Sequence, residues 1–440
     1  MNPIWRRTRL KRPIPDSAHA ELEDFQRLMT TAISPFAPEY FPTLPPLDGF
    51  TMATAEAGVK YRGRTDLWVL RCDPGTSVAG VFTQNRCPGA PVDWSRKALS
   101  ARPDGPRLVV VNSGTANVFS GQAGRDAVKL TAQGAVEVFG GHADAVQIAS
   151  TGVIGVALDA SKVVAQFPDM ASRMRSDGWD AAARAIMTTD TYPKGASATA
   201  MIHGTRVTIN GIAKGSGMIA PDMATMLAYI ATDARLDQAS LQALLTDLTG
   251  PTFNSITVDS DTSTSDTLLL LASGAADHPE VTGSDDPALA DFRQALRRVM
   301  FDLSQQIVRD GEGISKLIEV VVTGAVSNAS ADAVARSIAN SPLVKTAVAG
   351  EDANWGRIIM AVGKAGEPAE RDRLSIHIGP HCLATNGQPD PNYREAMGAA
   401  YMKQSEIRIG VDLALGEGAA TVYGCDLTHA YIDINADYRS

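Results

Sequence analysis

The central stretch Gly211–Ala234 changes character within a few residues, and this change constrains how the chain can fold. Its first half is rich in glycine and carries one proline, so its backbone can adopt conformations closed to other residues, including positive φ at Gly215 and Gly217. The run Met223–Ile230 is mainly apolar and unbroken by Gly or Pro, which is typical of a buried strand or the first turns of a buried helix. Thr225 lies at this junction, where a hydroxyl is most often a cap or turn former and a catalytic nucleophile is the alternative.

The composition is that of a globular protein and disfavours two classes of partner. The 440 residues exceed the usual size of one hydrophobic core, so we expect two or more packed substructures. The formal net charge of -9 disfavours nonspecific binding to nucleic acid, because a polyanion gains binding energy from basic surface. The longest apolar runs, such as Leu268–Ala272, are far too short to cross a bilayer, so no membrane partner is expected.

Cysteine and histidine usage indicates a reducing compartment and contains no metal motif. Four cysteines are scattered without a Cys-x-x-Cys pair, which fits free thiols in the cytoplasm better than a disulfide framework. His377, His381 and Cys382 have ligand-like spacing but lack a fourth ligand, so we assign no metal.

Hydrophobic periodicity predicts alternating groups of strands and helices. Short alternating or continuous apolar runs predict strands, and apolar residues at i, i+3, i+4 and i+7 predict helices. The order of these groups favours a layered α+β sandwich over a doubly wound sheet. The strands are expected at 67–70, 78–82, 108–111, 145–149, 317–322, 374–378, 407–413 and 431–434. The helices are expected at 125–139, 181–187, 241–248 and 289–307, the last with Gly311 as its stop.

Two of these strands end in small polar loops of the kind that build binding sites. The strand 108–111 leads into Asn112–Asn117, and the strand 145–149 leads into Ser150–Gly155. Strands of an α/β sheet that end in such loops on one side usually place a site there. A further polar stretch, Asn254–Thr267, is dense in hydroxyls and carboxylates, but it lacks the glycine that an EF-hand loop requires at its sixth position.

Seven motifs together make the chain, from about Ser34 to Ser440, resemble one family, the bifunctional glutamate N-acetyltransferases, also called ornithine acetyltransferases. One such motif is weak support, whereas seven in the same order are specific. The motifs are Thr54-Ala-Glu-Ala-Gly58, Asn112-Ser-Gly-Thr-Ala-Asn117, Ser150-Thr-Gly-Val-Ile-Gly155, Lys214-Gly-Ser-Gly-Met-Ile-Ala-Pro-Asp-Met-Ala-Thr-Met-Leu227, Val258-Asp-Ser-Asp-Thr-Ser-Thr-Ser-Asp266, Gly350-Glu-Asp-Ala-Asn-Trp-Gly-Arg357 and Asn435-Ala-Asp-Tyr438.

The resemblance implies an enzyme that cleaves its own chain between Ala224 and Thr225. The two fragments, 34–224 and 225–440, would stay associated, with two copies of each in a heterotetramer. The implied fold is an α/β/β/α sandwich of the ornithine acetyltransferase and DmpA-like kind, with a smaller C-terminal α/β subdomain. Residues 1–33 include a basic segment outside the family pattern and are expected to form a flexible extension.

The implied reaction is a ping-pong acetyl transfer in arginine biosynthesis. Thr225 Oγ attacks the Ala224 carbonyl during self-cleavage, and the new α-amine, with a reference pKa of about 7.7 to 8.0, then serves as the general base. Thr225 takes the acetyl group from N-acetylornithine and passes it to glutamate, so no cofactor is required. Some family members also use acetyl-CoA as donor, and no motif here distinguishes the two kinds.

The oxyanion and carboxylate contacts are carried over from the family by position. Thr151 and Gly152 would stabilise the oxyanion, where a simple turn is the alternative reading of the residues. Lys214 would bind a substrate carboxylate, and its Lys-Gly-Ser-Gly sequence lacks the order of a nucleotide-binding loop. Thr188 matches a substrate-binding threonine of the family, and the adjacent Thr189 is the alternative.

The remaining substrate contacts come from the C-terminal half. Glu312 would bind a substrate amine, where a solvated loop carboxylate is the alternative. Asn435 and Ser440 would complete the pocket, and Ser440 stands where many members have threonine. Two other functions stay open: an N-terminal-nucleophile amidohydrolase or aminopeptidase, in which water is the acceptor, and an uncleaved binding protein. The retention of Lys214, Thr225 and Glu312 together argues against the binding protein.

Overall fold

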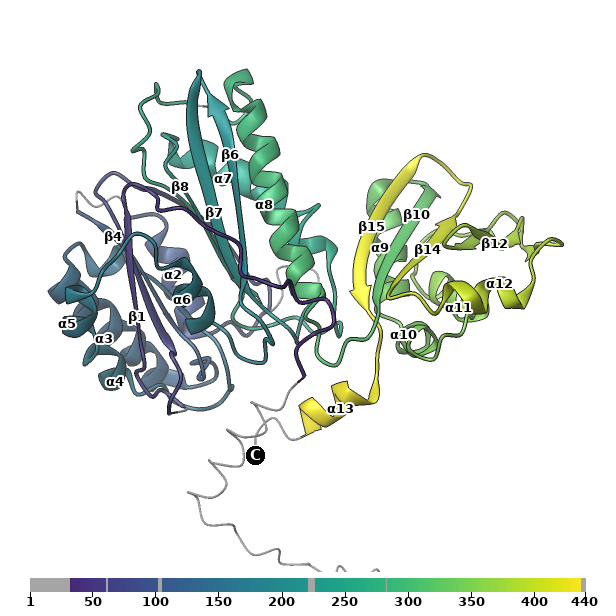
Figure 1. Ribbon diagram of the computed structural model, residues 1–440, viewed down its shortest axis with the longest axis horizontal. Helices are drawn as coiled ribbons and strands as arrows, with labels where there is room; N and C mark the ends of the chain where they lie inside the picture. Colours follow the sequence, from purple (N-terminus) through teal and green to yellow (C-terminus); the bar gives the residue numbers. More distant parts are fainter. Residues whose placement is uncertain (1–31, 61, 102–104, 221–225, 282, 437–440) are drawn as a thin grey trace, which may run out of the picture.

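The computed structural model describes residues 32–60, 62–101, 105–220, 226–281 and 283–436. Ala224, Thr225 and Ser440, together with the extension up to residue 31, lie outside these described residues. The described chain forms a large layered sandwich and a smaller C-terminal unit, which occupy opposite sides of Figure 1.

Two β-sheets form the inner layers of the sandwich, with strand orders β1-β2-β4-β5 and β3-β9-β8-β7-β6. The facing sides of the sheets share one core. In it the rings of Trp68 and Tyr229 pack edge to face, with 4.9 Å between the ring centroids. Strands β4, β8 and β9 each contain consecutive apolar residues without a polar alternation, because both faces of these strands are buried. The strands are β1 Phe50–Ala55, β2 Leu67–Cys72, β4 Arg107–Asn112 and β5 Gln147–Ser150 in the first sheet, and β3 Ser77–Phe82, β6 Lys194–Ile202, β7 Thr205–Lys214, β8 Leu227–Thr232 and β9 Thr267–Ala272 in the second.

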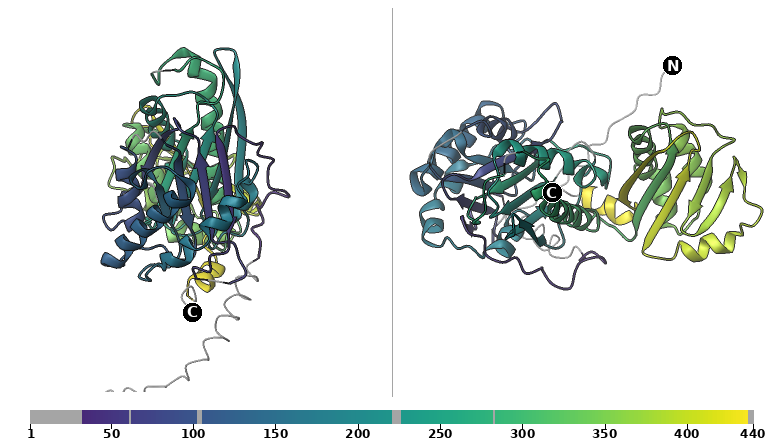
Figure 2. Two further views of the ribbon diagram at one scale, coloured as in Figure 1. Left: turned by 90° about the vertical axis from the view of Figure 1, so that its left-hand side faces the viewer. Right: turned by 90° about the horizontal axis from the view of Figure 1, so that it is seen from above.

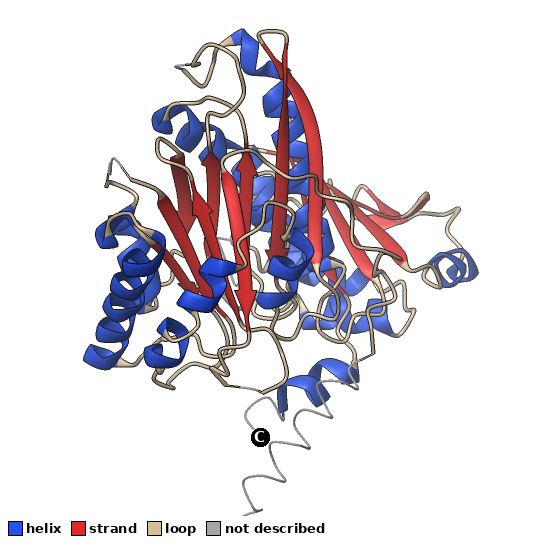
Figure 3. Ribbon diagram, turned by 60° about the vertical axis from the view of Figure 1, so that its left-hand side comes forward, coloured by secondary structure: helices blue, strands red, loops and turns tan. Residues whose placement is uncertain are grey.

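Helices cover the outer face of each sheet. The first sheet packs against α3 (Gly121–Phe139), α4 (Ala160–Val164) and α5 (Phe167–Ser172). The second packs against α7 (Gln238–Thr249) and α8 (Ala290–Val308), whose apolar residues fall on one face at helical spacing. Two further helices of the sandwich are α2 Ala90–Ala98 and α6 Trp179–Ala185. The helix–sheet–sheet–helix order in Figure 3 confirms the predicted layered α+β sandwich.

The C-terminal unit has its own sheet and its own hydrophobic core. The strand order is β13-β12-β11-β14-β10-β15, and helices α9 to α11 contribute to the core. In the right-hand view of Figure 2, helix α13 lies between this unit and the sandwich. The elements are β10 Leu317–Ala325, α9 Asn328–Ala339, α10 Pro342–Ala349, α11 Trp355–Gly363, β11 Ser375–Ile378, β12 His381–Thr385, β13 Gln388–Pro389, α12 Glu395–Tyr401, β14 Glu406–Asp412, β15 Gly418–Cys425 and α13 His429–Ala436.

The chain on the two sides of the predicted cleavage position lies in one sheet. Strand β7 ends at Lys214 and β8 begins at Leu227, and these two residues pair directly in the antiparallel ladder. On its other side β8 pairs with β9 in parallel. Because β7 precedes and β8 follows the bond between residues 224 and 225, fragments formed there would still share a hydrogen-bonded sheet.

Three local expectations were wrong. The predicted strand 431–434 belongs to helix α13, because this segment has left the sheet and a helix satisfies backbone groups that have no neighbouring strand. Helix α8 ends at Val308, before the predicted stop at Gly311. Gly215 has a φ of 153°, as expected, but Gly217 does not have a positive φ. No helix among the described residues is both long and apolar enough to cross a membrane.

Candidate functional site

One cavity brings together the predicted site residues that the structure describes. It has a volume of about 480 Å³ and lies where loops from both sheets meet helix α13. The proposed cleavage residues and Ser440 are outside the described residues, so their positions stay a prediction. The predicted residues that line the cavity are Thr151, Gly152, Thr188, Lys214, Glu312 and Asn435, and Thr189 lines it as well.

The loops that follow β4 and β5 build one wall of the cavity. These strands are parallel with Asn112 opposite Ser150, so both loops leave the sheet at the same edge, as predicted. The Thr151 amide donates to the Asn112 carbonyl at 3.0 Å. Gly152 has a φ of 129°, and a Cβ there would lie 2.3 Å from the carbonyl carbon of Gly114. Only glycine therefore fits this position without a shift of the backbone.

Lys214 is a buried cation held by two hydroxyls. Its Nζ donates to Thr188 Oγ1 at 2.8 Å and to Thr151 Oγ1 at 3.1 Å. Burial lowers the pKa of Lys214, and the nearby Asp190 acts in the opposite direction. Thr188 is thus the threonine that contacts the lysine, whereas the neighbouring Thr189 hydroxyl lies beside Glu312.

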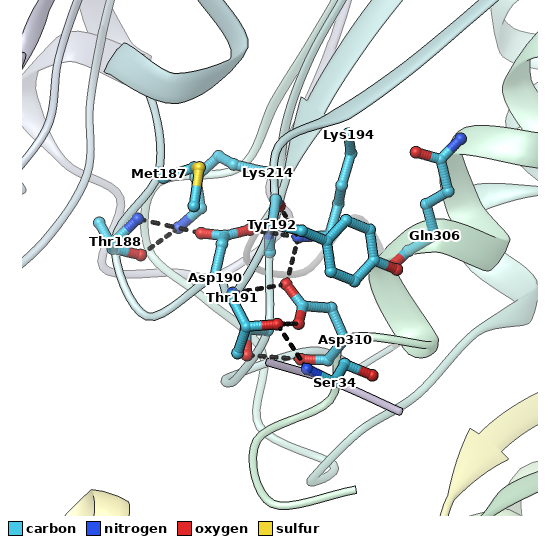
Figure 4. Close-up of polar contacts among 12 residues, drawn as sticks. Ser34, Met187, Thr188, Asp190, Thr191, Tyr192, Lys194, Lys214, Gln306 and Asp310 are labelled. Carbon is cyan, nitrogen blue, oxygen red and sulfur yellow. Dashed lines mark hydrogen bonds and ion pairs between the residues drawn. The ribbon is translucent and has the colours of Figure 1, made fainter. Parts of the chain in front are cut away.

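Asp190 joins three parts of the site. Its carboxylate accepts from the amide of Thr188 at 3.0 Å and from the amide of Gly215 at 2.6 Å. It also pairs with Lys194 Nζ at 2.6 Å, as Figure 4 shows. Although burial acts to raise the pKa of Asp190, the charges of Lys194 and Lys214 hold it well below its usual value. The ionised carboxylate therefore fixes the loop that follows β7.

Lys194 lies between two buried carboxylates. Besides Asp190 it binds Asp310 Oδ2 at 2.6 Å, and all three side chains are inaccessible to solvent. Asp310 also accepts from the amide and hydroxyl of Thr191. The two lysines, Lys194 and Lys214, balance the two carboxylates, so the cluster carries no net charge when all four groups are ionised. This balance reduces the cost of burying them.

The opposite wall of the cavity is formed by Glu312 and by helix α13. Asn435 Nδ2 donates to Glu312 Oε2 at 2.7 Å. Burial raises the pKa of Glu312, while hydrogen bonds from Asn435 and Thr189 act in the opposite direction. A Cβ on Gly217 would lie 2.3 Å from Glu312 Oε2. A side chain at this position would displace the carboxylate of Glu312, whereas the φ of Gly217 is not positive.

Sequence reasoning missed the buried charge cluster of Asp190, Lys194 and Asp310. A usable signal was present, since Asp190 stands four residues before Lys194 and Asp310 two residues before Glu312, next to segments already identified. Periodicity could not show that Asp310, which lies more than a hundred residues later, meets Lys194. Among the described residues, no group of three or more His, Cys, Asp or Glu side chains is placed to hold a metal ion.

The fold and the cavity define a helix–sheet–sheet–helix protein with a polar site at the strand ends, and comparisons with known proteins identify its family. The ArgJ family model matches residues 51–440. The arginine biosynthesis bifunctional protein ArgJ of Agrobacterium fabrum is 56% identical over 415 residues, which cover 94% of this chain and 100% of that protein. The chain therefore belongs to the ArgJ family, as the sequence motifs predicted.

Two solved structures are also similar to this chain. Arginine biosynthesis bifunctional protein ArgJ from Bacillus halodurans has 44% sequence identity and a TM-score of 0.45, and the match covers 46% of this chain and 95% of that one. Ornithine acetyltransferase from Mycobacterium tuberculosis, solved with ornithine, has 29% identity and a TM-score of 0.33, covering 42% of this chain and 96% of that one. Family membership rests on the sequence matches.

The charge cluster leads to a stability prediction. Replacing Lys194 with Met is expected to lower the free energy of unfolding by about 3 to 5 kcal/mol, because two buried carboxylates lose the cation between them. Urea unfolding followed by tryptophan fluorescence measures the loss. Arg184→Met is the matched control, since Arg184 pairs with Asp180 four residues away but both side chains are half exposed. A loss no larger than that of the control would contradict the proposed importance of the cluster.

Proposed function

We propose that this chain is a self-cleaving acetyltransferase of arginine biosynthesis that moves the acetyl group of N-acetylornithine to glutamate. The observation that carries the proposal is a buried lysine and a buried carboxylate, Lys214 and Glu312, lining the same cavity. N-acetylornithine carries one carboxylate and one ammonium group. Lys214 suits the carboxylate and Glu312 suits the ammonium, which orients the acetylated nitrogen between them.

Thr225 is the proposed nucleophile of self-cleavage. Its Oγ bonds to the carbonyl carbon of Ala224, the bond from that carbon to the nitrogen of Thr225 breaks, and the hydroxyl proton ends on the freed amine. Water then hydrolyses the ester, which leaves a carboxylate on Ala224 and a free hydroxyl on Thr225. Support comes from the position of Thr225 in the chain, one residue before Met226 and two before Leu227, the partner of Lys214 in the sheet.

The same hydroxyl then carries the acetyl group in two steps. In the first, the α-amine of Thr225 takes the hydroxyl proton while Oγ attacks the acetyl carbon, and the proton passes to the departing nitrogen of ornithine. In the second, the amine of glutamate attacks the acetyl ester, and its proton returns to Thr225 Oγ through the same α-amine. No oxidant or cofactor enters this balance.

Thr151 and Gly152 are the proposed oxyanion donors. Within the described part of the chain the amide of Gly152 donates to no acceptor, whereas its neighbours Thr151 and Val153 are both bonded to the loop after β4. An amide held in place without a partner is what a developing oxyanion requires. The Thr151 hydroxyl, which accepts from Lys214, supplies the second donor.

Further components of this proposal are supported by the membership of the chain in the ArgJ family. Thr188 holds Lys214, Asn435 holds Glu312, and Ser440 closes the substrate pocket. Two copies of each fragment assemble in the cytoplasm as a heterotetramer, and acetyl-CoA serves as a second acetyl donor. The amidohydrolase alternative is not favoured, because the relatives bear the name of a bifunctional biosynthetic protein.

The cleavage step is tested on a denaturing gel with intact-mass measurement. The wild-type chain of 46.4 kDa is expected to give two fragments of roughly half that mass, the second beginning at Thr225. Thr225→Ala should stay uncut and inactive because it lacks the attacking hydroxyl, whereas Thr225→Ser keeps a hydroxyl and should be cut. A single uncut wild-type chain would remove the basis of the mechanism. Consumption of N-acetylornithine at the same rate with and without glutamate would favour the amidohydrolase.

The raised pKa of Glu312 leads to a pH prediction. Protonation of the α-amine of Thr225, the general base, already makes kcat/KM for N-acetylornithine fall on acidification. Because only the ionised carboxylate attracts the substrate ammonium, protonation of Glu312 should add a second fall at lower pH, with its midpoint above the usual Glu pKa of about 4.3. Glu312→Gln should abolish this second fall, the acid limb due to Glu312, while keeping the first, and should cost about 2 kcal/mol or more in kcat/KM, roughly 30-fold. Glu137→Gln, on the exposed face of α3, is the control. An unchanged acid limb in Glu312→Gln would assign the limb to another group.

A further inference from the structure

The segment Thr257–Asp266, which lies within the polar stretch Asn254–Thr267 of the sequence, has no role in the chemistry above. It runs from just after the short helix η2 (Phe253–Ser255) to the residue before β9. Its last part also borders the cavity, through Ser263, Thr264 and Ser265. We call residues 257–266 the polar segment, and its contacts show what it holds.

The beginning of the polar segment is hydrogen-bonded to the backbone of Ile219, and we call this set of contacts the first grip. The carboxylate of Asp259 accepts from the amide of Ile219 at 2.9 Å and from the amide of Met218 at 2.6 Å. The carbonyl of Ile219 accepts in turn from the amide of Val258 at 2.8 Å and from the hydroxyl of Thr257 at 3.2 Å. Both backbone polar groups of Ile219 are therefore bound to this segment.

The end of the polar segment is hydrogen-bonded to the backbone of Met226 in the same way, and we call this set of contacts the second grip. The carboxylate of Asp266 accepts from the amide of Met226 at 2.8 Å. The carbonyl of Met226 accepts from the amide of Thr267, the next residue after Asp266, at 3.1 Å. Ile219 and Met226 are also both buried. The two grips thus lie on opposite sides, in the sequence, of the proposed cleavage bond between residues 224 and 225.

The polar segment is itself held by hydrogen bonds from other parts of the chain. Thr83 donates its amide to the Asp266 carbonyl at 3.1 Å and its hydroxyl to the Ser263 carbonyl at 2.6 Å. The amide of Gly89 donates to the Thr264 carbonyl at 2.9 Å. From the C-terminal unit, Lys345 Nζ donates to the Val258 carbonyl at 2.7 Å. Since three other parts of the chain hold it, the segment is a rigid support for the two grips.

Burying the carboxylates of Asp259 and Asp266 lowers the stability of the fold. Asp266 is fully buried and its Oδ2 has no hydrogen-bond partner among the described residues. The charge of Lys214 acts to lower the pKa of Asp266, but the hydrogen bonds of Lys214 go to Thr151 and Thr188. Burial raises the pKa of Asp266 well above its usual value and also raises that of Asp259. An apolar side chain would avoid this desolvation cost, so stability alone does not account for these carboxyls, whereas positioning of the amides that they bind does.

We propose that the polar segment is a two-point clamp that fixes the main chain on both sides of the scissile bond, with Asp259 and Asp266 as positioning residues for self-cleavage. This inference rests on the proposed cleavage between Ala224 and Thr225. Attack of a hydroxyl on the carbonyl of the preceding residue requires a backbone geometry that a free loop rarely adopts. Fixing Ile219 and Met226 holds the described chain in place on both sides of the scissile bond.

The test is the rate of self-cleavage of the full-length chain, followed on denaturing gels from the time of synthesis. Asp259→Ala and Asp266→Ala should each slow cleavage about 100-fold or more, because a misplaced reacting group loses rate on this scale. The double variant should be little slower than either single variant, since releasing one grip already frees the chain. Asp266→Asn keeps a carbonyl acceptor for the amide of Met226 and should recover most of the rate. Asp259→Asn keeps an acceptor for only one of the amides of Met218 and Ile219, which bind different oxygens, and should recover less.

The matched control is Asp233→Ala. Asp233 follows the last residue of β8, whereas Met226 precedes the first. The carboxylate of Asp233 accepts from the amide of Thr208 at 2.8 Å and does not line the cavity. This variant should cleave at the wild-type rate at a temperature at which circular dichroism shows every variant folded. Wild-type rates in both single clamp variants, or equal slowing by the control, would overturn the clamp while leaving the proposed function intact. An uncut wild-type chain would overturn both.

Discussion

The buried contact of Lys194 with Asp190 and Asp310 is the interaction on which the site depends. Asp190 accepts from the amides of Thr188 and Gly215 on its two different oxygens, which suits an ionised carboxylate, and Lys194 keeps it ionised in the absence of solvent. Lys214 joins the same cluster through Thr188, so its charge is balanced at a position where an unpaired cation would be costly.

Three parts of the fold contribute to one cavity, and each supplies a different kind of group. The first sheet supplies the Thr151 and Gly152 loop, which is rigid because it is bonded to the neighbouring loop after β4. The second sheet supplies Lys214 and the start of β8. Helix α13, which returns from the C-terminal unit, supplies Asn435. Because the parts come from both sides of residue 225, neither proposed fragment alone contains the site.

Much of this architecture could be predicted from the sequence, and the failures have physical causes. Buried strands such as β4 and β9 and the amphipathic helix α8 have strong local patterns, and the motif order identified the family. Helix α13 was mistaken for a strand because its apolar residues alternate, and only the absence of a neighbouring strand decides its conformation. The contact of Asp310 with Lys194 is set by packing of α8 against β6, which no local pattern encodes.

The most direct test of the account is the mass of each fragment after exposure to N-acetylornithine without glutamate, followed by rapid acid quenching. The account predicts that the fragment beginning at Thr225 gains one acetyl group and that the other fragment is unchanged. Adding glutamate before the quench should remove the acetyl group and yield N-acetylglutamate. An acetyl group on the N-terminal fragment, or active enzyme that never acquires one, would contradict Thr225 as the carrier.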